Sequence, residues 1–261
     1  MRVAPYSCAP PLGSRDHLRR RRPLFRNTAH VYDLIYEGTG KDYAAEADAL
    51  RELVTERNAR ARSLLDVACG TGGHLVHLRQ WFDVAGLDIE APMLAEARRK
   101  LPEVPLIQAD MRTFQLHRQF DVIVCLFSSI GYMRSTAELQ QAVGRMTAHL
   151  VPGGVLVVDG WIRPDHWIEP RTVHAEAGRR PGLAAARVGR SRREGNTSFL
   201  EIHHLIGTLD GVDYVVDHHE LTLFEPAEYH DAFSRAGLVV EVVPGPLAGR
   251  DRYIGVRPSR R

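Results

Sequence analysis

The sequence predicts a doubly wound, Rossmann-like α/β fold that carries an inserted antiparallel β-sheet. Short apolar segments alternate with segments of helical periodicity between residues 63 and 159, and such repeated units are typical of a parallel sheet covered on both faces. A glycine-rich turn follows the first apolar segment directly. Beyond residue 183 the pattern changes to long strands of mixed polarity, which indicates a second, antiparallel sheet.

The first part of this pattern begins with two predicted helices. Apolar side chains recur every three or four residues from Val31 onward, and Gly38 and Gly40 interrupt the pattern. The alternating segments that follow are predicted as strand 63–68, helix 75–82, strand 84–89, helix 91–101, strand 106–108, strand 120–126, helix 136–150 and strand 154–159.

The last hundred residues supply the inserted sheet and a return to the main one. Strands are predicted over 184–194, 197–208 and 212–223, because Gly195-Asn196 and Asp210-Gly211 between them favour tight turns. Helix 226–236 and strands 238–243 and 252–256 then follow. The domain prediction is a disordered arginine-rich extension (1–28), an α/β domain with a helical lid (29–160), the inserted sheet (161–225) and the return to the main sheet (226–261).

Composition and charge narrow the class of protein. The chain has 261 residues, 44% of them hydrophobic, and a net charge of +2. Residues 1–28 hold seven arginines and one aspartate, so the rest of the chain is slightly acidic and offers no basic face for nucleic acid. No apolar run approaches the ~20 residues that cross a bilayer, and the three cysteines (Cys8, Cys69, Cys125) form no disulfide framework. We expect a cytoplasmic protein with no membrane or nucleic-acid partner.

The segment from Leu64 to Leu75 carries the most informative motif. An apolar strand containing Asp66 runs into Ala68, Cys69 and a glycine cluster and then into a helix. Glycine lets backbone N–H groups approach a ligand closely, and a helix N-terminus favours negative charge. A dinucleotide site would have its first glycine at position 68, where this chain has alanine, so the fit to NAD is imperfect.

Further polar groups follow the next strands at the same predicted edge of the sheet. Asp88 ends the second strand, 22 residues after Asp66, where a carboxylate can bind the ribose hydroxyls of an adenosine ligand. Asp110 and Met111 follow the third strand, and Ser128 follows the fourth. Ligands of open α/β sheets bind outside the carboxyl ends of the strands, so these residues predict a binding site there.

These residues resemble the class I S-adenosyl-L-methionine (SAM)-dependent methyltransferases. Their Asp-x-x-x-Gly-x-Gly motif matches Asp66, Gly70 and Gly72, and Pro152-Gly153-Gly154 also matches. The resemblance implies a class I methyltransferase sheet, SAM as cofactor, and contacts to its methionine, ribose and adenine portions. The expected cofactor-binding residues are Tyr43, Asp66, Ala68, Gly70, Gly72, Asp88, Ile89, Met93, Asp110, Met111 and Leu126.

A closer resemblance extends over almost the whole chain after residue 29. Segments such as 31–36, 40–43, 127–132 and 193–196 are similar to the bacterial dTDP-3-amino-deoxysugar N,N-dimethyltransferases of desosamine and mycaminose pathways. The resemblance implies a homodimer and a nucleotide-sugar substrate, with the inserted sheet serving substrate binding and dimerisation. It departs at Thr39, where the pattern has an arginine that touches SAM.

Methyl transfer to an amine needs alignment and an uncharged nitrogen, so the catalytic candidates are groups that can orient the amine or take its proton: Tyr36, Tyr132 and His219. Arginine suits a diphosphate through forked hydrogen bonds. The substrate-binding candidates are Tyr36, Ser128, Trp161, Arg187, Ser191, Arg193 and Arg250. Adjacent histidines on a strand point to opposite faces, so neither His203-His204 nor His218-His219 predicts a metal site.

Four other readings remain open at this point. The enzyme could add one methyl group to the same class of sugar, or methylate a nitrogen or oxygen of another small molecule. A SAM- or nucleotide-binding scaffold without turnover and an NAD oxidoreductase also fit a glycine-rich turn in an α/β domain.

Overall fold

The computed structural model describes residues 24–168, 174–245 and 249–259. The helices are α1 (Ala29–Gly38), α2 (Tyr43–Arg57), α3 (Gly73–Leu78), α4 (Ala91–Lys100), α5 (Thr136–Ala148) and α6 (Pro226–Arg235), with 3₁₀ turns η1 (Ser129–Tyr132) and η2 (Pro164–His166). The strands are β1 (Ser63–Val67), β2 (Asp83–Asp88), β3 (Leu106–Gln108), β4 (Phe120–Cys125), β5 (Leu150–Ile162), β6 (His174–Arg180), β7 (Leu183–Glu194), β8 (Thr197–Thr208), β9 (Gly211–Thr222), β10 (Val239–Pro244) and β11 (Arg250–Val256).

A seven-stranded sheet forms the main body. Its strand order is β10-β11-β5-β4-β1-β2-β3, and all neighbouring pairs from β5 to β3 are parallel. β11 pairs antiparallel with both β5 and β10. The order reverses between β1 and β4, so their carboxyl ends flank the crevice in which doubly wound folds bind ligands. The predicted fold class is therefore confirmed.

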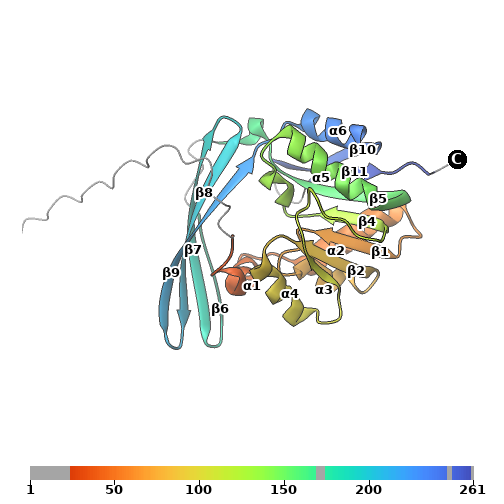
Figure 1. The fold of residues 1–261 in the computed structure, drawn as a ribbon. Helices are drawn as coiled ribbons and strands as arrows, with labels where there is room; N and C mark the ends of the chain where they lie inside the picture. Colours follow the sequence, from red (N-terminus) through yellow and green to blue (C-terminus); the bar gives the residue numbers. More distant parts are fainter. Residues whose placement is uncertain (1–23, 169–173, 246–248, 260–261) are drawn as a thin grey trace, which may run out of the picture.

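Two apolar cores cover the faces of this sheet. On one face, α5 and α6 pack through residues such as Val143 and Phe233. On the other, α2, α3 and α4 pack through residues such as Leu50, Leu75 and Leu94. Figure 1 shows the two helical layers on opposite sides of the strands. Packing on both faces explains why β1, β4 and β5 are almost continuously apolar.

The inserted sheet is a separate antiparallel meander in the order β6-β7-β8-β9. It stands beside the main body, with α1 between the two (Figure 1). The prediction found β7, β8 and β9 to within two residues but did not include β6. The strand His174–Arg180 contains two alanines and one glycine but no β-branched residue, so it lacks the pattern that marks a strand in sequence.

A close backbone approach fixes α1 against β6. A Cβ atom on Gly178 would lie 1.9 Å from the carbonyl oxygen of Leu34, so only glycine fits at this position. Val31 and Ile35 of α1 bury their side chains against Ala185 and Ile206 of the same sheet. Helix α1 therefore packs against the inserted sheet as well as against the main body.

The prediction of a disordered extension over residues 1–28 is wrong at its C-terminal end. Thr28 is buried and donates a hydrogen bond from Oγ1 to Oδ2 of Asp217 over 2.7 Å, and the ring of Phe25 contacts those of Tyr32 and His219. These contacts are made with β9 and α1, which the local sequence cannot reveal. Residues 1–23, with Cys8 and the arginine run 19–22, lie outside the described residues.

Candidate functional site

One cavity lies where the main sheet, the α1–α2 lid and the inserted sheet meet. Its volume is about 1010 Å³, at the upper end of the range for ligand sites, so it has room for two ligands side by side. It is lined from the main sheet by residues such as Asp66 and Asp88, from the lid by Tyr36 and Tyr43, and from the inserted sheet by residues such as Arg187. The structure thus brings most of the predicted site residues together.

The turn after β1 opens the backbone toward this cavity. Ala68, Gly70 and Gly72 all have positive φ, at 61°, 56° and 75°. A residue with a side chain is strained at positive φ, so the backbone conformation of Ala68 is unfavourable in energy. Residues strained in this way are common at functional sites. Ala68 and Gly70 line the cavity. Gly72 does not; it immediately precedes α3 and leaves room for Leu101, whose Cδ1 would lie 3.0 Å from a Cβ atom at this position.

Three buried carboxylates lie at the carboxyl edge of the sheet. Asp66, Asp88 and Asp159 are 2%, 7% and 4% exposed. Burial, reinforced by Asp88 and Asp159, raises the pKa of Asp66 well above its usual value. Arg252 binds Asp159 through Nε at 2.7 Å and so balances one of the charges. A cationic ligand in the cavity would stabilise the remaining negative charge.

Asp88 is also held by the backbone around the turn. Its Oδ2 accepts the N–H of Gly70 and its Oδ1 accepts the N–H of Glu90, each over 2.8 Å. Burial raises the pKa of Asp88, and these N–H groups oppose the shift. A carboxylate oxygen has capacity for more than one donor, so Asp88 can still receive hydroxyl groups of a ligand.

The adjoining wall of the cavity contains Ile89, Met93, Met111 and Leu126, as well as Asp110. The Asp110 carboxylate accepts Nε and Nη2 of Arg112, and Nη1 of that arginine donates to Glu138 at 2.6 Å. Asp110 is thus bound into a network of charges. Its fixed position beside apolar Met111 and Leu126 suits the recognition of a flat heterocycle.

A polar cluster on the lid was not among the predicted site residues. Nζ of Lys41 binds both carboxylate oxygens of Glu46, at 2.7 and 2.8 Å, and Nε2 of His74 lies 2.8 Å from Glu46. The same Nζ lies 4.1 Å from the ring centroid of Phe127. These contacts tie the start of α2 to α3 across the cavity. Glu46 and His74 are 28 positions apart, and Lys41 and Phe127 are farther apart still, so sequence spacing gave no sign of the contacts between them.

Phe127 and Ser128 make a sharp turn at the end of β4. Both have positive φ, at 54° and 64°, although neither is glycine. Asp159 accepts the N–H of Phe127 at 3.1 Å, and the Ser128 hydroxyl donates to the carbonyl of Gly160 at 2.7 Å. β5 therefore holds the strained turn, which carries the Phe127 ring against Tyr36.

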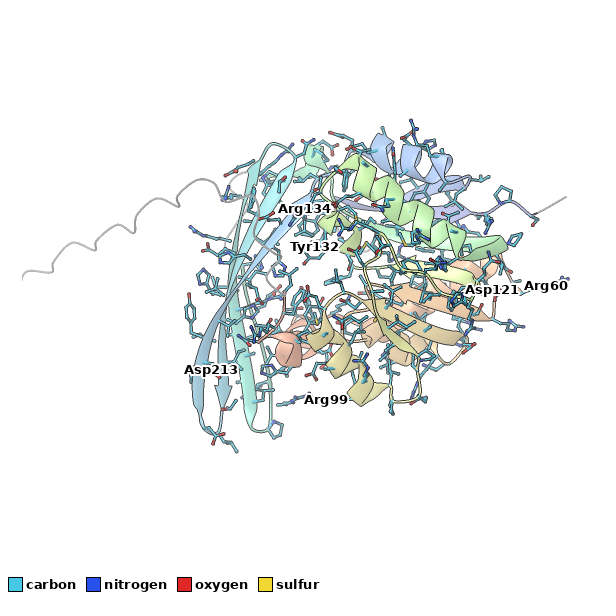
Figure 2. All side chains as sticks on the ribbon, in the orientation of Figure 1. Arg60, Arg99, Asp121, Tyr132, Arg134 and Asp213 are labelled. Carbon is cyan, nitrogen blue, oxygen red and sulfur yellow. The ribbon has the colours of Figure 1, made fainter. Side chains whose placement is uncertain are left out.

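The catalytic candidates lie on two sides of the cavity. Tyr132 and His219 share a hydrogen bond of 2.8 Å between the hydroxyl and Nδ1, whereas Tyr36 lies on the lid. Figure 2 shows Tyr132 between the main body and the inserted sheet. Burial lowers the pKa of His219 to about 4 and raises the pKa of Tyr132, so both groups are uncharged at neutral pH.

The predicted arginines do not converge on one point. Arg187 is buried, pairs with Glu176, and places its Cζ 4.3 Å from the Tyr36 ring centroid. Arg250 stacks on Trp161 at 4.2 Å and donates to the Ser128 hydroxyl at 3.3 Å. Trp161 binds Ser198, which pairs with Arg193, six residues from Arg187 along β7. At ~3.3 Å per residue the backbones of Arg187 and Arg193 are roughly 20 Å apart along the strand, so Arg187 and Arg250 are anchored at different parts of the cavity wall.

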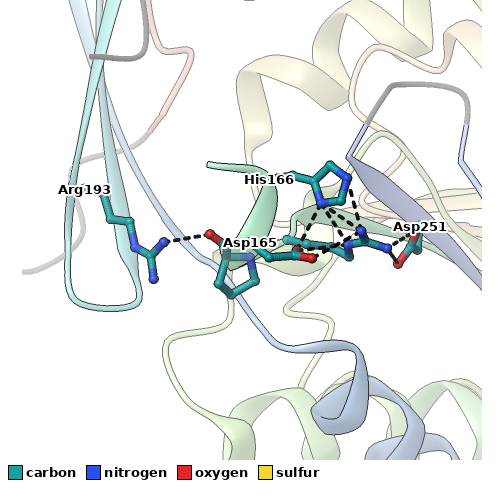
Figure 3. A network of polar contacts seen from close by, with 6 residues as sticks. Asp165, His166, Arg193 and Asp251 are labelled. Atoms are coloured by element: carbon teal, nitrogen blue, oxygen red, sulfur yellow. Dashed lines mark hydrogen bonds and ion pairs between the residues drawn. The ribbon is translucent and has the colours of Figure 1, made fainter. Parts of the chain in front are cut away.

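Arg193 is a correction to the prediction. It does not line the cavity; its Nη1 donates to the carbonyl of Pro164 at 2.9 Å (Figure 3), and its Nε donates to the carbonyl of Gly195. Pro164 begins a turn in which Arg163 binds Asp165, His166 and Asp251. Arg193 therefore braces the end of β7 against the segment next to Arg250. Ser191, two residues earlier on the same strand, does line the cavity.

Adjacent histidines point to opposite faces, as predicted. His204 and His219 are buried on the inner face and line the cavity, whereas His218 is exposed. In the part of the chain that the structure describes, no group of three His, Cys, Asp or Glu side chains forms a metal site. None of the described helices is long and apolar enough to span a membrane.

Comparison with protein families and curated proteins gives matches along most of the chain. Residues 64–154 match a family described as a methyltransferase domain. The chain is 48% identical to a dTDP-3-amino-3,4,6-trideoxy-α-D-glucopyranose N,N-dimethyltransferase of Streptomyces venezuelae, covering 87% of this chain and 97% of the relative. It is 44% identical to a dTDP-3-amino-3,6-dideoxy-α-D-glucopyranose N,N-dimethyltransferase of Streptomyces fradiae, and the match covers 87% of this chain and 90% of that relative. A dTDP-4-amino-2,3,4,6-tetradeoxy-D-glucose N,N-dimethyltransferase of Saccharopolyspora spinosa is 39% identical to this chain, and the match covers 88% of this chain and 92% of that relative.

Solved structures agree with these relatives. The chain matches DesVI of Streptomyces venezuelae with a TM-score of 0.84 and 47% identity, over 89% of this chain and 99% of that one. It matches SAM-bound CalS10, an amino pentose methyltransferase from Micromonospora echinaspora, with a TM-score of 0.78 and 37% identity. This match covers 94% of this chain and 100% of that one.

Proposed function

Since the chain belongs to the family of SAM-dependent dTDP-amino-sugar N,N-dimethyltransferases, we propose that it places two methyl groups on the amino nitrogen of a dTDP-linked amino-deoxyhexose. The observation that carries this proposal is the shared cavity. The carboxylates of Asp66 and Asp88 and the turn after β1 line its main-sheet side, and arginine and aromatic side chains line its inserted-sheet side. A cofactor and a nucleotide sugar can therefore meet in one enclosed space.

The main-sheet side suits the enzyme's SAM. SAM supplies an electrophilic methyl group on a positively charged sulfur. We assign Asp66 and the open turn at Ala68 and Gly70 to its methionine portion, and Gly72 shapes that turn from behind the cavity. Asp88 is assigned to the ribose. The burial of Asp66 and its raised pKa support this choice, because a nearby cation favours the charged carboxylate and offsets the cost of burying it.

The adenine is assigned to the neighbouring wall, where Asp110 is fixed by Arg112 beside Met111. Ile89, Met93 and Leu126 supply apolar contacts, and Tyr43 closes the site from the lid. Tyr43 packs closely there, because a Cβ atom on Gly73 would lie 2.7 Å from its ring. The lid therefore excludes water from the reacting groups.

Orientation is the main catalytic contribution that we assign to this site. Methyl transfer requires the nitrogen lone pair to point along the bond between carbon and sulfur, and holding reactants in line can supply about 7 to 11 kcal/mol at best. Tyr36 and Tyr132 approach from the lid and from η1, on two sides of the space beside the Phe127 turn. We propose that their hydroxyl groups fix the amine.

His219 acts through Tyr132 in this proposal. With a pKa of about 4, its buried imidazole is a weak proton acceptor at neutral pH. Its hydrogen bond instead orients the Tyr132 hydroxyl. The substrate amine must arrive uncharged, because an ammonium group has no lone pair, and the proton released after each transfer leaves toward solvent.

The diphosphate of the sugar nucleotide is assigned to Arg250 and Ser128. Arg250 is held between the Trp161 ring and the Ser128 hydroxyl, which pre-orients its donors. Arg187 and Ser191 then face the sugar-ring end of the substrate, because Arg187 is already paired with Glu176 and stacked on Tyr36.

We also propose that two copies of the chain associate through the outer face of the inserted sheet. A cross-strand row of Ala177, Ala186, Leu205 and Tyr214 runs across all four strands of that face. Leu205 and Tyr214 are 53% and 62% exposed. An apolar row of this kind is self-complementary about a two-fold axis, and burying it in a homodimer removes it from water. The buried thiols of Cys69 and Cys125 support a cytoplasmic setting.

A product assay tests the proposed activity. Purified protein, SAM and a dTDP-3-amino-deoxyhexose should give products 14 and then 28 mass units heavier by mass spectrometry, with one S-adenosylhomocysteine per transfer. A single addition under all conditions would reduce the activity to monomethylation. SAM binding without S-adenosylhomocysteine formation from any amino sugar would refute the proposal and favour a binding scaffold.

A further inference from the structure

His204 has an unusual environment for a buried polar side chain. It is 4% exposed and lines the cavity, yet among the described residues neither ring nitrogen has a hydrogen-bond partner. Its Nε2 lies 3.4 Å from Oδ2 of Asp217, an ion-pair contact without hydrogen-bond geometry. Buried polar atoms in native proteins are nearly always paired, so this imidazole calls for an explanation.

The position of His204 relates it to the reacting groups. His204 pairs in register with Arg187, whose guanidinium stacks on Tyr36. Asp217 lies on the adjacent strand, two residues before His219, which binds Tyr132. Two residues of a strand span roughly 7 Å, so His204 and Asp217 lie along the cavity wall between the two tyrosines assigned to the amine.

The chemistry of the pair selects one kind of ligand. A neutral imidazole has one N–H donor and one acceptor nitrogen, and the Asp217 carboxylate only accepts. A hydroxyl group both donates and accepts, so it can satisfy the two side chains at once. A phosphate would be repelled by Asp217. The Thr28 hydroxyl already donates to Asp217 and holds the carboxylate in place.

We propose that His204 and Asp217 bind a ring hydroxyl next to the amino-bearing carbon, and so make the enzyme specific for an amino sugar that retains one. The proposal rests on the function proposed above and refines its substrate. A site built to bind a hydroxyl group discriminates strongly against an analogue that lacks it, because its own polar groups are then left unpaired.

Three dTDP sugars test this specificity with the purified full chain. The 3-amino-3,6-dideoxyglucose has hydroxyls on both sides of the amine, the 3-amino-3,4,6-trideoxyglucose only at C2, and the 3-amino-2,3,4,6-tetradeoxyglucose on neither side, while the amine stays on C3 in all three. We expect kcat/KM for the tetradeoxy sugar to be lower than for the dideoxy sugar by roughly a hundredfold or more. The trideoxy sugar identifies the hydroxyl: an unchanged kcat/KM assigns it to C2, and a loss assigns it to C4.

Variants connect the discrimination to these two side chains. His204→Leu and Asp217→Asn should each reduce the ratio of kcat/KM between the dideoxy and tetradeoxy sugars at least tenfold, whereas His204→Gln, which keeps a donor and an acceptor, should retain most of it. Because each ratio is measured within one variant, it does not depend on the fraction of folded protein. His203→Leu is the matched control, since His203 lies on the opposite face of the same strand.

Equal use of the dideoxy and tetradeoxy sugars by the wild-type chain would overturn the inference, as would an unchanged ratio in both His204→Leu and Asp217→Asn. No turnover of any of the three sugars would instead refute the proposed function, so the two failures are distinguishable.

Discussion

Asp88 is the carboxylate that we assign to the ribose of SAM. It fixes the backbone of Gly70 and Glu90 and retains capacity for ribose hydroxyls. Asp88→Ala should weaken SAM binding at least tenfold, because hydrogen bonds to a charged acceptor are worth roughly 1.5–3 kcal/mol each. Isothermal titration calorimetry measures the effect. Asp83→Ala, at the exposed opposite end of the same strand, should bind SAM like the wild type. Equal SAM affinity of Asp88→Ala and Asp83→Ala would contradict the assignment.

His219 makes the stability of the fold depend on pH. Its pKa is about 4 in the folded chain, chiefly because of burial; Asp217 opposes the shift, and His204, Arg187 and His218 reinforce it. The unfolded chain binds a proton near the usual value of about 6.5, so the stabilisation is present above that pH and is lost as pH falls toward 4. The effect amounts to about 3 kcal/mol.

Thermal denaturation between pH 7 and pH 4 tests this effect. The melting temperature of the wild type should fall more steeply in this range than that of His219→Gln, which cannot titrate there. His218→Gln is the control, because its side chain is exposed on the other face of β9 and its slope should follow the wild type. Parallel slopes for His219→Gln and wild type would show that His219 is not the source.

At the level of elements, the lid is fastened to the cofactor turn by polar contacts. Asp33 of α1 accepts the Thr71 hydroxyl and the Lys100 ammonium, both at 2.6 Å. Asp33→Ala removes both contacts, so the lid should open more often and SAM should dissociate roughly tenfold faster. Stopped-flow displacement measures the rate. Asp48→Ala, on the exposed side of α2, should leave it unchanged. A rate for Asp33→Ala equal to that of the control would show that these contacts do not limit opening.

Elements with a strong local signal were predicted well from the sequence. β1, β2 and β4 were found to within about a residue, because they are apolar and end in recognisable turns. β5 runs from Leu150 to Ile162, well beyond the predicted segment 154–159, because its pairing with β11 continues as far as Ile162 and carries Trp161 to the cavity. β6 was missed for lack of β-branched residues. Such extensions depend on tertiary pairing, which local sequence does not encode.

The candidate site was predictable where its residues share one motif. Asp66, Gly70 and Asp88 follow neighbouring strands and line the cavity as expected. The pairing of Asp159 with Arg252 joins residues 93 positions apart, and that of Thr28 with Asp217 joins residues 189 apart. Arg193 was misplaced because it lies on the same face of β7 as Arg187 and Ser191 but at the end of the strand, where it binds the backbone of Pro164 and Gly195.

At the level of the whole molecule, the exposed row on the inserted sheet predicts the assembly. Leu205→Glu should convert the dimer to a monomer, because a charge replaces an apolar group at the centre of the proposed contact. Size-exclusion chromatography with light scattering measures the mass. Val239→Glu changes an apolar residue on β10 that is also exposed, and this variant should remain dimeric. A monomeric wild type, or a dimeric Leu205→Glu, would contradict this interface.

The close packing of α1 on β6 affects the order in which the two methyl transfers and the release of products take place. The backbones of Leu34 and Gly178 touch, and the same helix carries Tyr36 toward the substrate and Asp33 toward the cofactor turn. S-adenosylhomocysteine must leave before a second SAM can enter. Because α1 contacts both the cofactor side and the substrate side of the cavity, it cannot move to open one side without loosening the other. Dimethylation by this enzyme should therefore be distributive: the singly methylated sugar escapes, accumulates early in the time course, and is recaptured in competition with fresh substrate.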